Sequence, residues 1–304
     1  MEKVIVVIGP TSVGKTKMGV ALAKKFNGEV ISGDSMQIYK QMDIGTAKVT
    51  EEEKEGIIHH CVDILNSDET YSVHDFQQTV RKKITEITQR GHVPIIVGGT
   101  GLYIKAALYD YQFDEMENDH HAINEKYKDY TNEQLHDHLK SIDEESAKTL
   151  HFNNRRRVLR AIEIYETTGK RKSEMLEEQE HICLYDAYFV GLTLPRDVLY
   201  ERINKRVDVM MENGLKEEME RLYSQGLTRN HQSMKAIGYK EWFDYYDHQI
   251  DLNDVLELIK KHSRQYAKRQ YTWFKNQFDV HWYDVNLENF EQTIEQVTDD
   301  IEKS

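Results

Sequence analysis

Residues 4–16, Val-Ile-Val-Val-Ile-Gly-Pro-Thr-Ser-Val-Gly-Lys-Thr, decide the fold class of this chain. Residues 4–8 are five consecutive apolar, β-branched residues, which predicts a strand buried on both faces. Residues 9–16 then match the pattern Gly-x-x-x-x-Gly-Lys-Ser/Thr, and apolar residues from Met18 to Phe26 continue at helical spacing. A strand, a glycine-rich turn and a helix in this order predict an α/β fold, with a parallel sheet flanked by helices.

The glycine-rich turn has the residue types that a phosphate-binding loop (P-loop) requires. Gly9 and Gly14 allow positive φ angles, so that successive N–H groups point into one hollow, and the helix that follows adds a positive dipole end. Lys15 can reach two adjoining phosphates, and the Thr16 hydroxyl can hold a magnesium ion. We predict a site for a diphosphate or triphosphate, although the motif leaves open what is done with it. The predicted phosphate-binding residues are Gly9, Pro10, Thr11, Ser12, Val13, Gly14, Lys15 and Thr16.

Composition indicates a globular protein without membrane or disulfide features. The chain has 304 residues, of which 39% are hydrophobic and 31% charged, enough for a full core and a second domain. Cys61 and Cys183 lie far apart without metal-ligand spacing, and the sequence has neither a membrane span nor a signal-peptide pattern. We therefore expect a cytoplasmic protein with no disulfide framework and no zinc module. The net charge of −13 argues against nucleic acid as a partner, although a local basic face can still bind phosphates.

Asp34 follows the second predicted strand. Val30 and Ile31 form a short apolar run that ends at Gly33-Asp34-Ser35, which places Asp34 at the carboxyl edge of the sheet. In open α/β sheets this edge is where ligands bind, so we expect Asp34 near the P-loop. The residues alone leave two roles open, a catalytic carboxylate and an ordinary helix-cap or turn aspartate, of which the second is more common.

The third predicted strand, residues 93–97, ends in Gly98-Gly99-Thr100-Gly101 and follows a helix expected over about 74–90. Many P-loop enzymes place an aspartate after such a strand to hold magnesium. Here two glycines would let a ligand approach the backbone, and Thr100 offers a hydroxyl. This turn weakens the prediction of an ordinary NTPase without excluding it.

Residues 112–186 differ in composition from the rest and predict a helical insertion. They are rich in Asp, Glu, His, Lys and Tyr and have few β-branched runs. We expect a P-loop core in two parts, residues 1–111 and 187–304, with a strand over 187–194 that returns to the sheet and helices from there to the end. His59-His60 is expected in a long loop with a surface or structural role. The helical stretches predicted inside the insertion are 132–140, 143–150 and 153–168.

Two stretches are locally basic despite the acidic chain. Residues 153–172 contain seven Lys and Arg against Glu163 and Glu166, and residues 260–275 contain six with no acid. Four aromatic residues are interleaved with the second stretch. Basic groups and aromatics together suit single-stranded nucleic acid, because cations meet phosphates and rings stack on bases. A solvated helix face with aromatics turned into the core is an equally good interpretation.

Taken together, these segments resemble the tRNA dimethylallyltransferases, and the resemblance runs along nearly the whole chain. It implies a P-loop NTPase-like parallel sheet flanked by helices, with a helical insertion domain. The P-loop alone is shared by many families, whereas Asp-Ser-Met-Gln and Gly-Gly-Thr-Gly-Leu-Tyr in this order are far more specific. The matching segments are residues 9–16, 32–39, 59–60, 71–76, 98–103, 155–160, 234–240 and 268–275.

The resemblance implies a specific reaction. Members of this family transfer a dimethylallyl group from dimethylallyl diphosphate to the exocyclic amine of the adenine directly 3′ of the tRNA anticodon. The P-loop would then hold the diphosphate leaving group, with Mg²⁺ near Thr16. Asp34 would be the general base on the amine, and Thr100 and Arg206 would act at the reaction centre. The expected partners are the tRNA anticodon stem-loop and the diphosphate donor, with no membrane, no stable protein partner and a monomeric chain.

The resemblance also implies contacts to tRNA from residues 34–37, from the 156–160 run, and from residues 233–240 and 268–275. Between residues 117 and 125 the family often has an arginine that meets the tRNA, but this chain has Glu-Asn-Asp-His-His-Ala-Ile-Asn-Glu, so we assign no contact there. The C-terminal zinc finger of longer eukaryotic members is not expected either. The implied tRNA contacts are Asp34, Ser35, Met36, Gln37, Thr100, Arg156, Arg157, Arg160, Lys235, Lys240, Lys268, Arg269 and Lys275.

Three alternatives stay open. An adenylate isopentenyltransferase would prenylate a free nucleotide, although a free nucleotide needs no clamp such as the arginine run at 155–160. A small-molecule kinase would use the P-loop with ATP and would reveal itself by phosphate transfer. A P-loop RNA-binding module would keep its RNA affinity when Asp34 is changed and would have no catalysis to lose.

Overall fold

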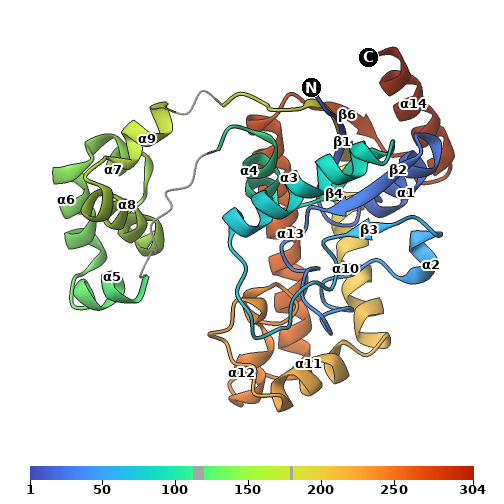
Figure 1. The fold of residues 1–304 in the computed structure, drawn as a ribbon. Coiled ribbons are helices and arrows are strands. Elements are labelled where there is room, and N and C mark those ends of the chain that lie inside the picture. Colours follow the sequence, from blue (N-terminus) through green and yellow to red (C-terminus); the bar gives the residue numbers. More distant parts are fainter. Residues whose placement is uncertain (112–119, 179–180) are drawn as a thin grey trace. The chain divides into compact units, whose positions relative to one another are not determined.

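The computed structural model describes residues 1–111, 120–178 and 181–304, which form two compact units (Figure 1). Met1–Tyr109 and Cys183–Ser304 make up the core unit, and Asp110–Ile182 make up the insertion unit. Residue 112, the predicted start of the insertion, lies outside the described residues, as do residues 117–119 of the segment compared with the family's arginine.

The core unit is built on a six-stranded sheet in which every strand is parallel to its neighbours. The order is β3-β2-β4-β1-β5-β6, with the predicted first strand at an inner position. This confirms the α/β class and the parallel sheet. The strands are β1 Lys3–Ile8, β2 Gly28–Ser32, β3 His59–His60, β4 Val93–Gly98, β5 Asp186–Thr193 and β6 His281–Asp284.

Two strands lie where the sequence predicted none. β3 falls in the expected loop, where His60 Nε2 lies 2.6 Å from a carboxylate oxygen of Glu29 on β2. β6 falls where only helices were expected, and it pairs with β5 through Leu192 and Tyr283. Both strands have four residues or fewer, too few for an alternation of apolar and polar residues to be recognised. They adopt strand geometry because their backbones hydrogen-bond to a longer neighbouring strand, β2 for β3 and β5 for β6.

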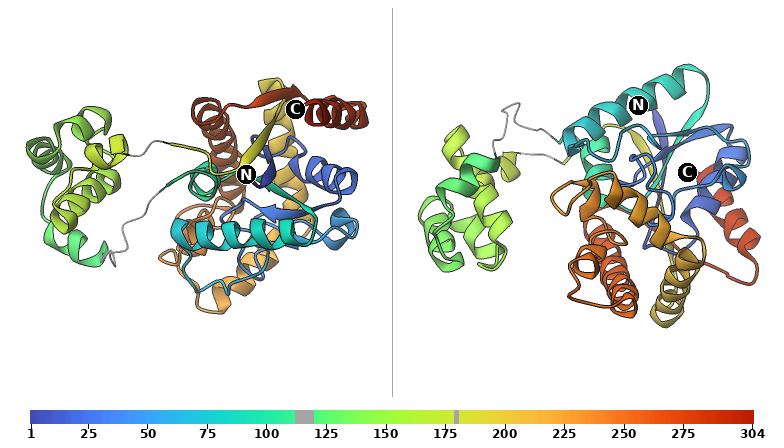
Figure 2. Two further views of the ribbon diagram at one scale, coloured as in Figure 1. Left: turned by 45° about the horizontal axis from the view of Figure 1, so that its top comes forward. Right: turned by 90° about the horizontal axis from the view of Figure 1, so that it is seen from below.

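Helices cover both faces of the sheet, as Figure 2 shows. Successive residues of a strand point to opposite faces, and β1 divides accordingly. Val4, Val6 and Ile8 belong to a core shared with α3 and α4, whereas Ile5 and Val7 belong to a second core shared with α1 and α14. The core-unit helices are α1 Lys15–Lys25, α2 Glu51–Lys54, α3 Val73–Gln89, α4 Gly101–Leu108, α10 Arg196–Glu212, α11 Leu215–Ser224, η1 Ser233–Lys235, α12 Trp242–Tyr246, α13 Leu252–Gln277 and α14 Phe290–Lys303.

The insertion unit has a hydrophobic core of its own. Leu135, Leu139 and Val158 are fully buried within it. The buried Asp143 carboxylate accepts the Ser146 N–H at 3.0 Å and the Ser173 hydroxyl at 2.7 Å, which ties the helices together. The three predicted helical stretches are present as α6, α7 and α8. The helices are α5 His120–Lys126, α6 Asn132–Ile142, α7 Glu144–Thr149, α8 Arg155–Thr168 and α9 Lys172–Glu178.

The carboxyl ends of β2 and β4 touch through two glycines. The Gly33 N–H donates to the Val97 carbonyl at 2.8 Å, and the Thr100 N–H donates to the Gly33 carbonyl at 3.2 Å. A Cβ on Gly98 would lie 2.3 Å from the carbonyl carbon of Gly33, closer than any side chain allows. The glycines therefore let the two strand ends come together, and they place Asp34 and Thr100 at one edge of the sheet.

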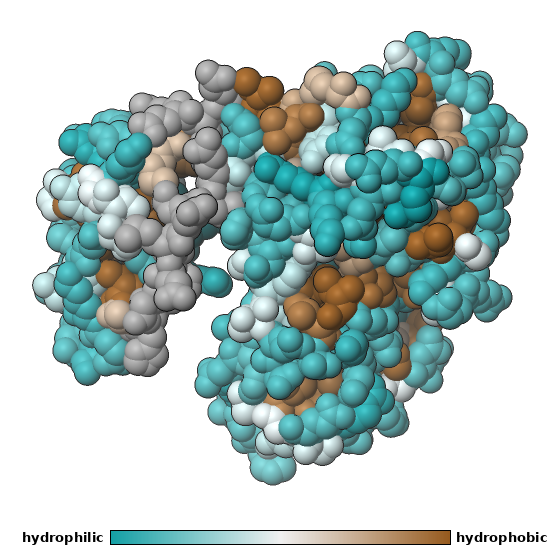
Figure 3. Space-filling view, viewed as in Figure 1, coloured by the Kyte–Doolittle hydropathy of each residue, from teal (hydrophilic) through white to brown (hydrophobic). Residues whose placement is uncertain are grey.

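The described surface has no membrane-spanning feature. The face of the core unit in Figure 3 is largely hydrophilic, with separate apolar patches. None of the described helices is long and apolar enough to cross a bilayer.

Candidate active site

The P-loop joins β1 to α1 in a conformation that requires glycine twice. Gly9 has φ +147° and Gly14 has φ +100°, angles that a side chain strongly disfavours. A Cβ on Gly9 would lie 2.5 Å from the Leu192 carbonyl oxygen, and one on Gly14 would lie 2.7 Å from the Phe290 ring. The turn therefore has the backbone curl that was predicted for a phosphate-binding hollow.

Two P-loop side chains are set up for an anion. The Lys15 amine donates to the Pro10 carbonyl at 2.7 Å, and burial, together with the Arg206 charge, lowers the pKa of Lys15 to about 7. The Ser12 hydroxyl is buried and has no hydrogen-bond partner among the described residues. A buried ammonium and an orphaned hydroxyl both gain when a negatively charged oxygen enters the hollow.

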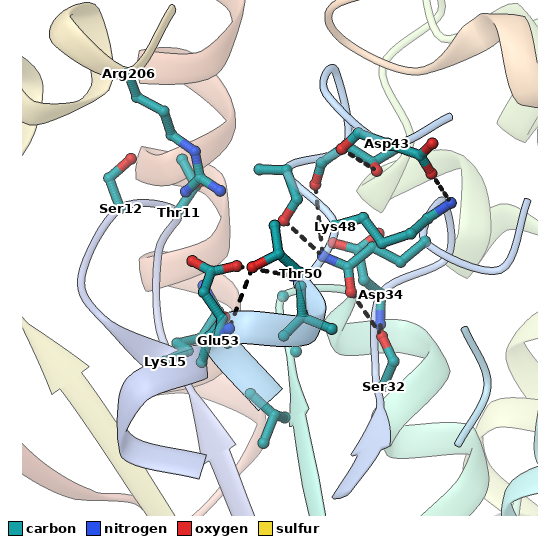
Figure 4. Close-up of a pocket in the computed structure, with 18 of the residues that line it drawn as sticks. Thr11, Ser12, Lys15, Ser32, Asp34, Asp43, Lys48, Thr50, Glu53 and Arg206 are labelled. Atoms are coloured by element: carbon teal, nitrogen blue, oxygen red, sulfur yellow. Dashed lines mark hydrogen bonds and ion pairs between the residues drawn. The ribbon is translucent and has the colours of Figure 1, made fainter. Parts of the chain in front are cut away.

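Helix α10 brings two arginines over the P-loop. Arg206 Nη1 donates to the Thr11 hydroxyl at 3.4 Å, and Arg202 Nε donates to the Ser12 carbonyl at 2.9 Å. Figure 4 shows Arg206 pointing from its helix toward Thr11 and Ser12. Burial lowers the pKa of Arg206, but a guanidinium stays charged in a protein. Arg206 therefore gives the hollow a fixed positive charge, and Lys15 adds a second one when its amine is protonated.

Asp34 lines this hollow beside Lys15, Arg206 and two further carboxylates, those of Asp43 and Glu53. Its Oδ1 accepts the Met36 N–H at 2.8 Å, which fixes the carboxyl in a turn just after β2. Burial raises the pKa of Asp34 above its ordinary value, although the Met36 N–H and the Lys15 charge oppose that effect. The arrangement holds a carboxylate of increased basicity beside a phosphate-binding loop.

Thr100 lies immediately behind this turn. Its Oγ1 accepts the Ser35 N–H at 3.1 Å and donates to the Ser35 hydroxyl at 3.3 Å. The neighbouring Gly99 carbonyl accepts bonds from Gln270 Nε2 at 3.0 Å and from the Tyr266 hydroxyl at 3.3 Å. The structure thus brings Asp34 and Thr100 together through Ser35, and Thr100 supports the turn that carries the carboxylate.

Two adjoining hollows meet at Asp34. The first, which we call the P-loop hollow, is also lined by Thr16, Gln37 and Arg202. Glu53 lines it as well and is labelled in Figure 4. The second, which we call the α13 hollow, is also lined by residues from the 235–240 segment and from α13. The residues lining both are Thr11, Ser12, Lys15, Asp34, Thr46, Ala47, Gly99, Arg206 and Met210.

Besides Asp34 and Thr100, the predicted tRNA contacts of the core unit fall into three groups: those that line the α13 hollow, one that lines the P-loop hollow, and those that line neither. Ser35, Met36, Lys235, Lys240 and Arg269 line the α13 hollow. Gln37 lines the P-loop hollow, where its Nε2 donates to the Ala47 carbonyl at 3.3 Å. Lys268 and Lys275 are exposed on α13 and line neither hollow.

The predicted tRNA contacts of the insertion unit lie on α8. Arg156 and Arg157 are exposed. Arg160 forms an ion pair with Glu163 at 2.8 Å, and the neighbouring Arg155 donates to two backbone carbonyls, those of Tyr127 and Tyr130. Two of the four arginines are therefore engaged within the unit, and the two exposed ones are available to a partner.

Gln270 is a site residue that the sequence did not reveal. Its Oε1 accepts the Thr11 N–H at 3.1 Å, and its Nε2 donates to the Gly99 carbonyl. A Cβ on Gly99 would lie 2.2 Å from that nitrogen. In the sequence it stands as a neutral polar residue inside the basic, aromatic segment 268–275 that matches the family, with nothing there to mark it as a P-loop contact.

Oxygen donors at the P-loop are the candidates for holding a metal ion. Within the described ranges, no group of three or more His, Cys, Asp or Glu side chains is placed to hold a metal ion. The Thr16 hydroxyl lines the P-loop hollow. A hard cation such as Mg²⁺ often takes one or two protein ligands and completes its shell with phosphate oxygens and water, so this donor set fits Mg²⁺ together with a bound diphosphate.

Comparison with known proteins gives a consistent result. Residues 37–277 match the family model described as IPP transferase. A tRNA dimethylallyltransferase of Bacillus cereus is 54% identical over 287 residues, covering 93% of this chain and 90% of the relative. A tRNA dimethylallyltransferase of Bacillus anthracis has the same identity and is covered to 91%.

Two solved structures are similar over their whole shared length. The tRNA delta(2)-isopentenylpyrophosphate transferase of Staphylococcus epidermidis has 47% identity and a TM-score of 0.75, covering 100% of this chain and 99% of that one. A eukaryotic dimethylallyltransferase acting on tRNA has 33% identity and a TM-score of 0.86, covering 98% of this chain and 78% of that one.

Proposed function

Because the chain belongs to the IPP transferase family, we propose that it transfers a dimethylallyl group from dimethylallyl diphosphate to tRNA. The acceptor is the exocyclic amine of the adenine directly 3′ of the anticodon. The predicted family and enzyme class, a tRNA-modifying prenyltransferase, are confirmed by relatives of 54% identity that bear that name. The observation that carries the mechanism is the position of Asp34 between two hollows, one built for an anion and one lined by exposed cations.

The donor's diphosphate belongs in the P-loop hollow. As the C–O bond of the donor breaks, negative charge grows on the leaving diphosphate. P-loop N–H groups, Lys15 and Arg206 are already in place and stabilise that charge most in the transition state. The orphaned Ser12 hydroxyl is a further donor for a phosphate oxygen. Thr16 would hold Mg²⁺, which supplies charge neutralisation to the diphosphate when bound.

The acceptor adenine belongs in the α13 hollow. An adenine amine is a weak nucleophile because its lone pair is delocalised into the ring. Asp34 takes the proton from the amine as the new N–C bond forms, while the electron pair of the broken C–O bond leaves with the diphosphate. A positioned base of this kind contributes about 10²–10⁴-fold to the rate. Its raised pKa makes Asp34 a stronger base than an exposed carboxylate.

Exposed cations, some of the core unit and some of the insertion unit, suit the backbone of the RNA. The adenine must leave the stack of the anticodon loop, which costs about a few kcal/mol and less in a loop than in a duplex. Lys235, Lys240 and Arg269 line the α13 hollow, and Arg156 and Arg157 are exposed on α8. Contacts between these groups and phosphates would offset that cost through counterion release.

A reconstituted assay tests the proposal. The purified chain is incubated with dimethylallyl diphosphate, Mg²⁺ and a synthetic anticodon stem-loop, and the digested nucleosides are analysed by mass spectrometry. We expect N6-(dimethylallyl)adenosine when the base 3′ of the anticodon is adenine. We expect no prenylated product when adenine is replaced by the unsubstituted base purine, which has the same ring but lacks the amine. Prenylation of free AMP in place of the stem-loop, or phosphate transfer from ATP, would overturn the proposal in favour of the nucleotide prenyltransferase or the kinase.

The cellular setting is also proposed. Cys61 and Cys183 form no disulfide, which suits the reducing cytoplasm, and we propose that the chain acts there as a monomer. Light scattering on the purified protein should give the mass of one chain, 35.9 kDa. A dimer mass at working concentration would contradict the monomer.

A further inference from the structure

The α13 hollow has two walls that come from distant parts of the sequence. One wall is the loop at residues 45–47, and the other is the segment 235–240. The two walls lie in close contact with each other. A Cβ added to Gly45 would lie only 2.5 Å from the Tyr239 ring, and a Cβ added to Gly238 would lie 3.3 Å from the Gly45 carbonyl oxygen. The absence of side chains on both glycines lets the two backbones approach this closely.

Glu218 of α11 sits under this junction and bonds to both walls. Its Oε2 accepts the N–H groups of Asp43 and Ile44, each at 2.9 Å, and its Oε1 accepts the Gly45 N–H at 3.1 Å. Its Oε1 also accepts the Tyr239 hydroxyl at 2.6 Å. The carboxylate is only 2% exposed. One buried charge thus holds the three consecutive N–H groups of residues 43–45, the last of which belongs to one wall, and an aromatic hydroxyl of the other wall.

We propose that Glu218 is a positioning residue that fastens the two walls of the α13 hollow and thereby sets the shape of the acceptor site. This inference rests on the proposed function, which places the adenine in that hollow. Glu218 itself lines neither hollow, so it acts through the loop and through Tyr239. A second buried carboxylate, Glu241, supports the same wall by accepting the Gly238 N–H at 2.9 Å.

The fastened loop also reaches the turn that carries the general base. The carbonyls of Thr46 and Ala47 accept bonds from Gln37 Nε2 at 3.5 and 3.3 Å. Gln37 Oε1 in turn accepts the Ser32 hydroxyl at 3.1 Å, two residues before Asp34. The P-loop is held by other contacts, from Gln270 and Arg202. Loss of Glu218 should therefore disturb the α13 hollow and leave the P-loop turn itself in place.

Replacing Glu218 with Gln isolates this role. The amide has the same shape, but one of its two polar atoms is a donor and faces groups that are themselves donors. At least one backbone N–H of Asp43, Ile44 or Gly45 then loses its acceptor, which is costly in a buried place. The loop at 45–47 should loosen from Tyr239 while the rest of the core unit stays folded.

The test measures acceptor and donor separately. For Glu218→Gln we expect the KM and the dissociation constant of the anticodon stem-loop to rise about tenfold. The affinity for inorganic diphosphate with Mg²⁺, measured by calorimetry, should stay within about twofold. The matched control is Glu29→Gln, which removes an equally buried carboxylate of β2 and should leave both affinities unchanged. Stem-loop affinity is read by fluorescence anisotropy without turnover, so a failure of the proposed reaction would not hide the result.

A milder variant covers the case in which Glu218→Gln does not fold. Tyr239→Phe removes one of the four donors and keeps the ring, and it should raise the stem-loop KM by a few fold. Tyr283→Phe is its control, because that hydroxyl bonds to Tyr188 and Asp300 at β6. If Glu218→Gln folds, an unchanged KM and dissociation constant for the stem-loop would overturn the proposal. If it does not fold, an unchanged stem-loop KM in Tyr239→Phe would do so. Equal losses of stem-loop and diphosphate affinity would overturn it as well.

Discussion

The side-chain oxygen of Gln270 accepts the backbone N–H of Thr11 at 3.1 Å, which joins helix α13 directly to the P-loop. The same amide donates to the Gly99 carbonyl at 3.0 Å, at the turn after β4. The two residues in the first bond are 259 positions apart in the chain. One buried amide therefore holds the phosphate-binding turn against the strand end that carries Thr100.

Gln270→Met should weaken donor binding. Methionine keeps the length and the packing but makes neither bond, so the Thr11 N–H and the Gly99 carbonyl lose their partners. Two lost hydrogen bonds correspond to about a tenfold increase in the dissociation constant of the donor, which calorimetry with inorganic diphosphate and Mg²⁺ would measure. Gln277→Met on the same helix, whose amide bonds to Lys105, is the control. Equal affinities in the two variants would show that the P-loop keeps its shape without Gln270.

Asp34→Asn should slow the chemical step by about 10²-fold or more, because the amide has the same size but is not basic. Donor affinity should change little, since the P-loop holds the diphosphate. Single-turnover transfer at saturating donor and stem-loop separates chemistry from binding. Asp68→Asn, an exposed change in the core unit, is the control. A variant with the normal single-turnover rate would make Asp34 a turn residue only.

The pH dependence of the wild-type rate should reveal the same carboxylate. A base must be ionised, so the rate falls as the pH drops through the pKa of Asp34. Burial raises that pKa, so the midpoint should lie above about 3.9, the value of an exposed aspartate. Single-turnover rates across the acidic range would show this limb in the wild type, and Asp34→Asn should lack it. A limb that persists in the variant would assign the titration to another group.

Lys15→Ala should abolish donor binding while stem-loop affinity changes much less. The amine is a buried cation of the P-loop hollow, and a lysine at this position of the turn can reach two adjoining phosphates. Diphosphate calorimetry and stem-loop anisotropy measure the two effects. Lys25→Ala, at the far end of the same helix and paired with Glu302 at 3.2 Å, should behave like the wild type. Normal prenyl transfer by Lys15→Ala would contradict the assignment of the P-loop.

Arg156→Glu with Arg157→Glu should weaken tRNA binding and flatten its salt dependence. These two side chains are exposed on α8, and each phosphate contact that is lost should lower the slope of log K against log salt by about 0.7–0.9. A filter-binding salt titration measures the slope. Lys140→Glu with Lys148→Glu, exposed on α6 and α7 in the same unit, is the charge-matched control. The same slope in both proteins would make the arginine run a solvated face.

Glu29→Gln should lower stability in a pH-dependent way. Burial alone would raise the pKa of Glu29, but hydrogen bonds from Arg90 at 2.7 Å and His60 at 2.6 Å outweigh it and hold the pKa below its ordinary value. A lowered folded-state pKa contributes stability that is present above the unfolded-state pKa and is lost as the pH falls through the folded-state value. We expect a loss of about 1–3 kcal/mol at pH 7.

Urea unfolding at neutral and at acidic pH would test this prediction. The difference between the wild type and Glu29→Gln should shrink as the pH approaches the range in which Glu29 takes up its proton. A difference that is constant with pH would mean that the charge of Glu29 contributes nothing and that only its packing matters.

Features confined to one short stretch could be predicted from the sequence. The P-loop is one: Gly9, Gly14 and Lys15 act through the local backbone, so eight consecutive residues specify both the turn and its ligand class. Asp34 was found because it follows a recognisable strand, and parallel strands present their carboxyl ends at one edge. The helices of the insertion also carry their own periodicity, so they could be found without knowledge of their neighbours.

Features that join distant stretches were decided by the tertiary structure. β6 was missed because four residues acquire strand geometry only from pairing with β5. Gln270 lies in a segment that resembles the family and Glu218 lies in none, but each matters because the fold places it against backbone N–H groups 170 or more residues away. A buried amide or carboxylate is stable only where such groups satisfy it. Which groups those are depends on the order of strands and the packing of helices, and this is why no local pattern in the sequence could reveal these two residues.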